Sequence, residues 1–147
     1  MPASGVIKLA DANVWLAIAF SDHVHHVKAC EWFDRQSNGT CAFCRITQLA
    51  LLRHLTNSAI MDRFVLSQRV AWQNFDRLLA DPRVIFLSEP PAIEAQFRAL
   101  TQSESPSNER WTDAYLAAFA SATGTQLATF DQGFKRFGLA DLMLLTK

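Results

Sequence analysis

Short apolar runs alternate with amphipathic segments along the whole chain, and few folds accommodate that alternation. Buried β-strands are expected at residues 6–10, 41–44, 84–87, 126–130 and 142–145. Helices are expected at residues 14–19, 26–33, 46–57, 70–80 and 91–102, and from residue 108 or 112 to 123. Parallel strands need long crossovers, and right-handed crossovers place helices on both faces of a sheet. The predicted class is therefore α/β, a three-layer α/β/α fold with a central, mostly parallel sheet.

The length and charge of the chain limit its organisation and its partners. Its 147 residues, half of them apolar, suffice for one core and predict a single domain over residues 1–147. Fourteen basic and fourteen acidic side chains cancel, which excludes the broad positive field of a protein that coats nucleic acid indiscriminately. The most signal-like stretch, residues 14–20, is too short to span a bilayer, so no membrane association is expected.

The three cysteines indicate a compartment. Cys30, Cys41 and Cys44 cannot all pair within one chain, and a reducing cytoplasm is the expected location. Cys41 and Cys44 have the spacing of a zinc ligand pair, but no second pair accompanies them. They are expected to be small buried residues around a short strand.

Aspartates follow two of the predicted strands directly. Asp11 comes after the first strand and Asp131 after the fourth, whereas Asp113 lies near the start of a helix on its inward stripe. In open parallel sheets, ligands bind beyond the carboxyl ends of the strands. Each aspartate alone is an ordinary turn or capping residue. Three at one sheet edge would repel one another, and a cation between them would explain their shared placement.

Mg²⁺ or Mn²⁺ suits such a cluster, because hard divalent cations prefer carboxylate and water oxygens and borrow further ligands from phosphate substrates. Such an ion activates water and neutralises the charge that grows on a phosphodiester. The predicted chemistry is that of a hydrolytic nuclease.

The three aspartates lie in three blocks of sequence, LADANV at residues 9–14, TDAYLA at residues 112–117 and LATFD at residues 127–131. In this order and at this chain length, the blocks resemble those of PIN-domain ribonucleases and, more closely, of the VapC toxins of bacterial toxin–antitoxin pairs. The resemblance covers residues 7–137.

This resemblance implies a Mg²⁺- or Mn²⁺-dependent endoribonuclease that acts on RNA. It also implies a homodimer, inhibited by a small VapB-type antitoxin whose tail enters the active site. Asp11, Asp113 and Asp131 would take the family's metal-binding roles. Asn13 and Thr129 match polar positions that support the acids.

One position departs from the family pattern. The usual second acid is a Glu early in the helix after the second strand, but Gln48 stands there. Some members resemble this chain in carrying a Thr-Gln pair followed by Leu-Arg, as in Leu52-Arg53. Gln48 still offers an amide oxygen, though without charge. Weaker or fewer metal sites are expected than in a four-acid relative.

The helix expected at residues 46–57 has two apolar stripes, which predicts that the core covers one side and a partner the other. This is a second reason to expect a homodimer. Arg53 shares a stripe with Ile46, Leu49 and Ala50. It would either reach an RNA phosphate or an active-site carboxylate, or form an interface or buried salt bridge.

Aromatic and imidazole side chains leave two further alternatives open. Trp111 would either stack on an RNA base or pack against the core. His23, His25 and His26 invite a zinc interpretation, but without acids at ligand spacing a core or rim histidine at a helix start is favoured.

Three functional hypotheses compete. The first is the endoribonuclease toxin, and the second is a PIN-like module weakened in catalysis through Gln48 that binds RNA or its antitoxin. The third, a phosphoacceptor receiver domain, needs an acceptor Asp after a central strand and a Lys near the last strand, and neither is evident.

Overall fold

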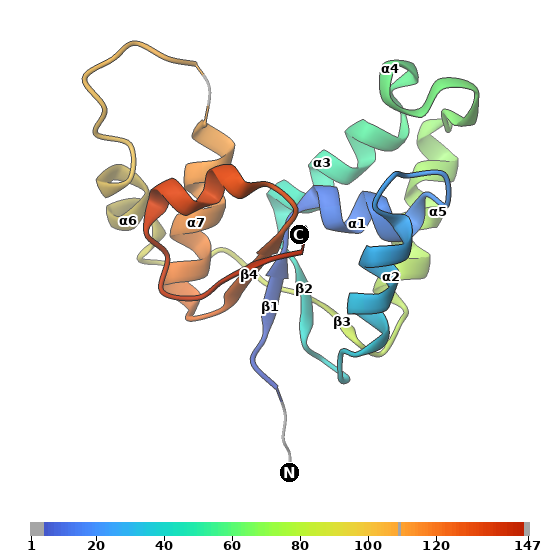
Figure 1. The fold of residues 1–147 in the computed structure, drawn as a ribbon, viewed down its shortest axis with the longest axis horizontal. Helices are drawn as coiled ribbons and strands as arrows, with labels where there is room; N and C mark the ends of the chain where they lie inside the picture. The colour runs from blue at the N-terminus through green and yellow to red at the C-terminus, as the bar shows by residue number, and fades with distance from the viewer. Residues whose placement is uncertain (1–4, 109, 146–147) are drawn as a thin grey trace.

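A computed structural model describes residues 5–108 and 110–145 (Figure 1). The strands are β1 (Lys8–Ala10), β2 (Cys41–Phe43), β3 (Val84–Phe86), β4 (Gln126–Thr129) and β5 (Leu142–Leu144). The α-helices are α1 (Ala12–Ala19), α2 (His26–Asp34), α3 (Arg45–Leu55), α4 (Ser58–Met61), α5 (Gln68–Leu79), α6 (Ile93–Ala99) and α7 (Trp111–Thr123). The 3₁₀ helices are η1 (Asp62–Phe64) and η2 (Gln132–Phe137).

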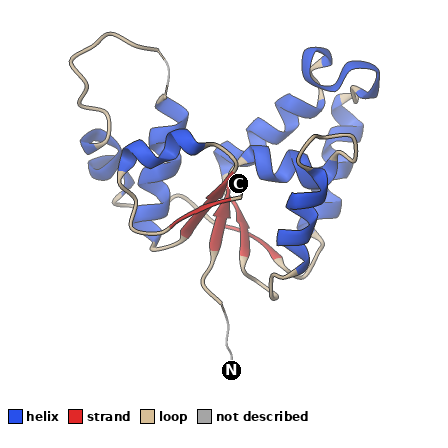
Figure 2. Cartoon of the chain, in the orientation of Figure 1, coloured by secondary structure: helices blue, strands red, loops and turns tan. Residues whose placement is uncertain are grey.

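The five strands form one parallel sheet in the order β3-β2-β1-β4-β5. Figure 2 shows the strands between two groups of helices. The chain builds one half of the sheet outward from β1 through β2 and β3, then returns to the other side of β1 with β4. The predicted α/β class and three-layer arrangement are confirmed.

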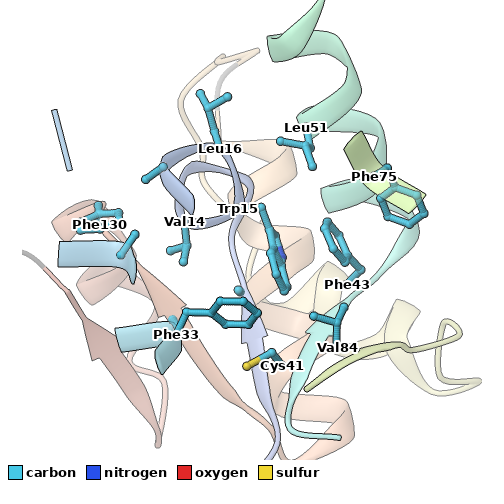
Figure 3. Packing of buried hydrophobic residues seen from close by; sticks show 14 of the residues in the cluster. Val14, Trp15, Leu16, Phe33, Cys41, Phe43, Leu51, Phe75, Val84 and Phe130 are labelled. Carbon is cyan, nitrogen blue, oxygen red and sulfur yellow. The ribbon is translucent and has the colours of Figure 1, made fainter. Parts of the chain in front are cut away.

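Two clusters of buried side chains cover the two faces of the sheet, because successive strand residues point to opposite faces. Cys41 and Phe43 join the cluster built with α1, α2, α3 and α5, whereas Ala42 joins the cluster of α6, α7 and η2. In the first cluster the Trp15 and Phe43 rings stack with centroids 4.0 Å apart (Figure 3). Packed side chains therefore cover both faces of the sheet, which leaves the ends of the strands for a site.

Several element boundaries differ from the expected ones. The first strand begins at Lys8, and α6 is confined to Ile93–Ala99 instead of residues 91–102. Thr101 and Gln102 donate side-chain hydrogen bonds to the carbonyls of Phe97 and Arg98, which ends that helix.

The helix expected to reach residue 57 ends at Leu55. Asn57 instead caps α4 by accepting a hydrogen bond from the Ala59 amide. The sequence patterns did not predict the short elements α4, η1 and η2. The expected end of α7 is confirmed, since Gly124 follows it with φ +67°, a conformation that favours glycine.

The cysteines pack as the sequence suggested. Cys41 and Cys44 are buried and lie in different clusters, on opposite faces of the sheet. Burial raises the pKa of the Cys41 thiol to about 11, which is typical of an unreactive structural cysteine. All three cysteines are free. Across the described residues, no helix has the length and apolar character that crossing a membrane requires.

Candidate active site

Asp11 and Asp131 follow neighbouring strands at the carboxyl edge of the sheet. β1 and β4 pair in parallel, with Ala10 opposite Ala128, and the Asp11 amide donates to the Ala128 carbonyl at 2.9 Å. This pair is the point at which the strand order reverses, where open parallel sheets place their ligands. The geometry therefore provides a site between β1 and β4.

The Thr129 hydroxyl is the centre of a hydrogen-bond network at this edge. It donates to Asp11 Oδ2 at 2.9 Å and accepts from the Asp131 amide at 3.0 Å and from Asn13 Nδ2 at 3.3 Å. The Asn13 side-chain oxygen accepts from the Phe130 amide at 3.4 Å. Thr129 is fully buried, so these bonds fix the ends of β1 and β4 relative to each other.

Asp11 is the electrostatic focus of the site. Its Oδ1 accepts from the Ala12 amide at 2.7 Å, which caps α1. Burial raises the pKa of the Asp11 carboxyl to about 6, against the hydrogen bonds from Thr129 and Ala12, which lower it. The negative charges of Asp113 and Asp131 also raise this pKa, so the structure brings all three acids into one electrostatic neighbourhood.

Asp113 is in the first turn of α7 and forms an ion pair that the sequence patterns did not reveal. Arg136 Nη2 donates to Asp113 Oδ2 at 3.2 Å, and both side chains are about 30% exposed, at 27% and 31%. Asp131 caps η2 by accepting from the Gly133 amide at 2.8 Å, and η2 carries Arg136 back toward α7. The sequence signal for this arrangement was Asp131, a residue type that often caps helices, five positions before Arg136.

Gln48 and Arg53 lie on α3. Gln48 is buried, and its side-chain oxygen accepts from Arg45 Nη1 at 2.6 Å. No hydrogen bond found within residues 5–108 and 110–145 joins Gln48 to an aspartate. Arg53 is exposed, which removes the interpretation of a buried salt bridge within this chain. The contacts of Arg53 with an RNA phosphate, with an active-site carboxylate or in an interface remain predictions.

The remaining candidates have structural contacts. His25 stacks on Phe130 with ring centroids 4.5 Å apart, and His26 Nδ1 lies 2.7 Å from the Ala17 carbonyl oxygen. His23 Nδ1 accepts from the His25 amide at 3.0 Å. These contacts agree with histidines that fix the start of α2. Trp111 belongs to neither buried cluster and is 52% exposed.

Comparison with known proteins identifies the family. A model of the PIN domain matches residues 8–139. The chain belongs to the PIN-domain family. Ribonuclease VapC41 of Mycobacterium tuberculosis is 42% identical to this PIN protein over 144 residues, 95% of this chain and 99% of the relative. That similarity places the chain among the VapC ribonucleases and confirms the resemblance seen in the sequence.

Solved structures share the PIN fold. Mycobacterium tuberculosis VapC20, described as a toxin that cleaves the Sarcin-Ricin loop, has a TM-score of 0.65 at 14% identity and covers 91% of this chain and 97% of its own. A toxin–antitoxin complex from Klebsiella pneumoniae has a TM-score of 0.64 at 16% identity, with coverage of 95% and 98%. At these identities the likeness concerns the fold.

The donor set of this PIN protein suits a hard divalent cation that keeps part of its water shell. In the part of the chain that the structure describes, no three His, Cys, Asp or Glu side chains, the three aspartates included, form a ready ligand group for a metal ion. Structural zinc needs such a group. Mg²⁺ is usually bound through one or two carboxylates plus substrate phosphates. Because burial and two neighbouring acids disfavour ionised Asp11, a cation there would stabilise it, and the residues fit Mg²⁺ or Mn²⁺.

Proposed function

We propose that this chain is a metal-dependent endoribonuclease, the toxin of a VapBC-type toxin–antitoxin pair. The observation that carries the proposal is the electrostatic coupling of Asp11 to Asp113 and Asp131 beyond the carboxyl ends of the strands. Gathering three acids from distant segments is unfavourable for folding alone but suits phosphodiester hydrolysis. The identity of 42% to a named ribonuclease supports RNA as the substrate.

Each residue of the site has an assigned role. Asp11, Asp113 and Asp131 would hold Mg²⁺ or Mn²⁺, which when bound lowers the pKa of water and offsets negative charge on a phosphodiester. Thr129 orients Asp11 and favours its ionised form through the hydrogen bond to Oδ2. Asn13 holds Thr129 in place from α1.

Arg136 and Gln48 are each expected to affect how strongly the site binds a metal ion. Arg136 partly neutralises Asp113 when no other cation is near. Gln48 offers an uncharged oxygen that Arg45 engages, so metal binding is expected to be weaker than in a relative with a fourth acid.

The partners and location follow from the same assignment. A small VapB-type antitoxin would inhibit the enzyme, and the toxin–antitoxin complex among the structural neighbours supports this partner. The half-exposed Leu49 on α3 supports a homodimer that covers this face of the helix. Arg53, on the same face, would reach an RNA phosphate or an active-site carboxylate, or lie in the dimer interface. Free cysteines support a reducing cytoplasm.

Cleavage of single-stranded RNA by the purified chain tests the proposal. We expect endonucleolytic products with Mn²⁺ or Mg²⁺ and none with EDTA. Asp113→Asn should abolish cleavage, whereas Asp76→Asn, which changes an exposed aspartate on α5, should leave it intact. Tight binding of RNA that stays uncut with Mn²⁺ would instead support the catalytically weakened binding module.

A further inference from the structure

A cavity of about 620 Å³ lies between the loop after α6, the first turn of α7 and η2. Its volume is within the range of about 300–1,000 Å³ that small-molecule sites occupy. Arg136 forms part of its wall and is also paired with Asp113. Through Arg136 the cavity therefore adjoins Asp113, one of the proposed catalytic acids.

The charge of the wall favours an anion. Arg110 and Arg136 line the cavity together with the hydroxyl-bearing Ser103 and Ser105, and no carboxylate is among its described lining residues. A neighbouring cavity of about 530 Å³ shares Thr101 and Trp111 but is lined by Glu89, Glu94 and Arg98, and Arg98 is paired with Glu94. An RNA phosphate would therefore be attracted more to the first cavity, which has two arginines, than to the second, where one arginine lies with two acids.

Arg136 is held in position before any ligand arrives. Its Nη1 donates to the Gly133 carbonyl, its Nη2 donates to Asp113, and its guanidinium lies 4.5 Å from the centre of the Phe137 ring. These two hydrogen bonds use two of the five N–H groups that a guanidinium offers. The group is thus oriented while retaining donors for a phosphate.

Trp111 supplies an aromatic surface next to these cations. Its side chain is 52% exposed, and its ring meets Phe97 edge to face, with centroids 6.1 Å apart and an interplanar angle of 72°. Single-stranded RNA is held by stacking unpaired bases on exposed aromatic rings beside basic side chains. Trp111 and the two arginines have this combination of properties.

We propose that this cavity is a subsite for one unpaired nucleotide adjoining the scissile phosphate. Its base stacks on Trp111, and its phosphate lies between Arg110 and Arg136. The inference rests on the proposed nuclease function for its substrate class, and it adds which side chains of this chain hold the nucleotide beside the scissile phosphate.

Fluorescence anisotropy with a labelled oligouridylate, in EDTA so that the RNA stays intact, tests the subsite. Trp111→Leu should weaken binding about 5- to 140-fold, the loss of one base stack, and Trp111→Phe should restore most of it. Trp72→Leu is the matched control, since Trp72 is 47% exposed but lies on α5. For an abasic ribose-phosphate oligomer, Trp111→Leu should have no effect.

The arginines are tested through salt dependence. Arg110→Ala should reduce the slope of log affinity against log salt by about 0.7, the value for one phosphate contact to a single strand. Arg77→Ala removes the same charge from exposed α5 and should leave the slope unchanged. The subsite is wrong if Arg77→Ala changes the slope as much as Arg110→Ala, or if Trp72→Leu weakens binding as much as Trp111→Leu. It is also wrong if Trp111→Leu weakens binding of the abasic oligomer as much as binding of the oligouridylate.

The subsite and the nuclease proposal can be disproved independently of each other. If the wild-type chain cleaves RNA with Mn²⁺ but Trp111 and Arg110 do not affect binding, the subsite is wrong and the nuclease assignment stands. If both residues govern binding but no metal ion produces cleavage, the subsite stands and the chain is an RNA-binding PIN module.

Discussion

At Asp11, stability and the proposed metal binding make opposite demands on one carboxyl group. The folded protein buries it beside two other acids, and its pKa rises from 3.8 to about 6. A hard cation requires the ionised form, which the fold disfavours in its absence. Metal-free protein should therefore carry a measurable destabilisation at neutral pH.

Substitution of Asp11 by Asn tests this destabilisation. A folded-state pKa above the unfolded value means that the unfolded chain releases its proton first, so stability falls as pH rises from about 4 to about 6. The difference corresponds to about 3 kcal/mol. Relative to wild type, Asp11→Asn should gain about that much more free energy of unfolding at pH 8 than at pH 4. Urea denaturation in EDTA measures it, and a pH-independent difference between the two proteins would contradict it.

The single hydroxyl of Thr129 makes hydrogen bonds to Asp11, Asn13 and the Asp131 amide. Thr129→Val keeps the shape but removes the donor to Asp11 and the acceptor for Asn13 and the Asp131 amide. We expect a loss of about 1–3 kcal/mol in the free energy of unfolding, because buried polar groups lose their partner, together with reduced cleavage. Thr129→Ser should recover most of both. A fully active Thr129→Val protein would show that the network has no part in catalysis.

At the scale of elements, η2 links two of the acids. Asp131 caps its start, and Arg136 in its last turn reaches Asp113 on α7. A Cβ atom at Gly133 would lie 2.6 Å from Arg136 Nη1 and 3.0 Å from Asp131 Oδ1. The absence of a side chain at this position allows the turn to bring these two groups together.

Gly133→Ala should therefore displace both the Arg136 guanidinium and the Asp131 carboxylate. The ion pair is partly exposed and contributes less than about 1 kcal/mol, so the loss of stability should be small. We expect a clear loss of RNA cleavage and affinity, measured by gel and anisotropy assays. Gly133→Ala should weaken RNA affinity less in an Arg136→Ala protein than in the wild type, because the effects of substitutions at neighbouring, coupled residues do not add. If the effects of Gly133→Ala and Arg136→Ala on RNA affinity simply add, the close approach of Gly133 to Arg136 does not matter for binding.

The sequence patterns predicted the regular elements and the carboxyl edge of the sheet, because apolar periodicity and strand-terminal acids are local signals. They did not predict α4, η1 or η2, which are short and have no apolar period. The pairing of Arg136 with Asp113 joins residues 23 positions apart through a turn whose direction the sequence does not specify. Gln48 was noted from the sequence, but its bond to Arg45 depends on side-chain conformation.

At the scale of the whole molecule, the two halves of the sheet meet at β1 and β4, and the helices spread to either side (Figure 1). α3 and α5 lie in one group of helices, α6 and α7 in the other. Leu49 on α3 is 48% exposed, in keeping with a second copy covering that face of the helix.

Light scattering at micromolar concentration should give a mass of twice 16.5 kDa for the wild-type chain. Leu49→Glu should shift the mass to that of the monomer, because it places an unpaired charge in the apolar interface. Val24→Glu is the control, since it makes the same kind of change at a more exposed site outside α3. A wild-type monomer, or a dimer that tolerates Leu49→Glu, would rule out this interface.

The order of the strands also means that the candidate site is completed late in the chain. β1 pairs with β2 on one side, and β3 joins the sheet beyond β2, whereas the other side of β1 is covered by β4, which begins only at Gln126. A nascent or truncated chain that lacks β4 also lacks Asp131, so under the proposed function it should have no ribonuclease activity. If the proposed function holds, the ribosome would release the chain almost as soon as it could cut RNA.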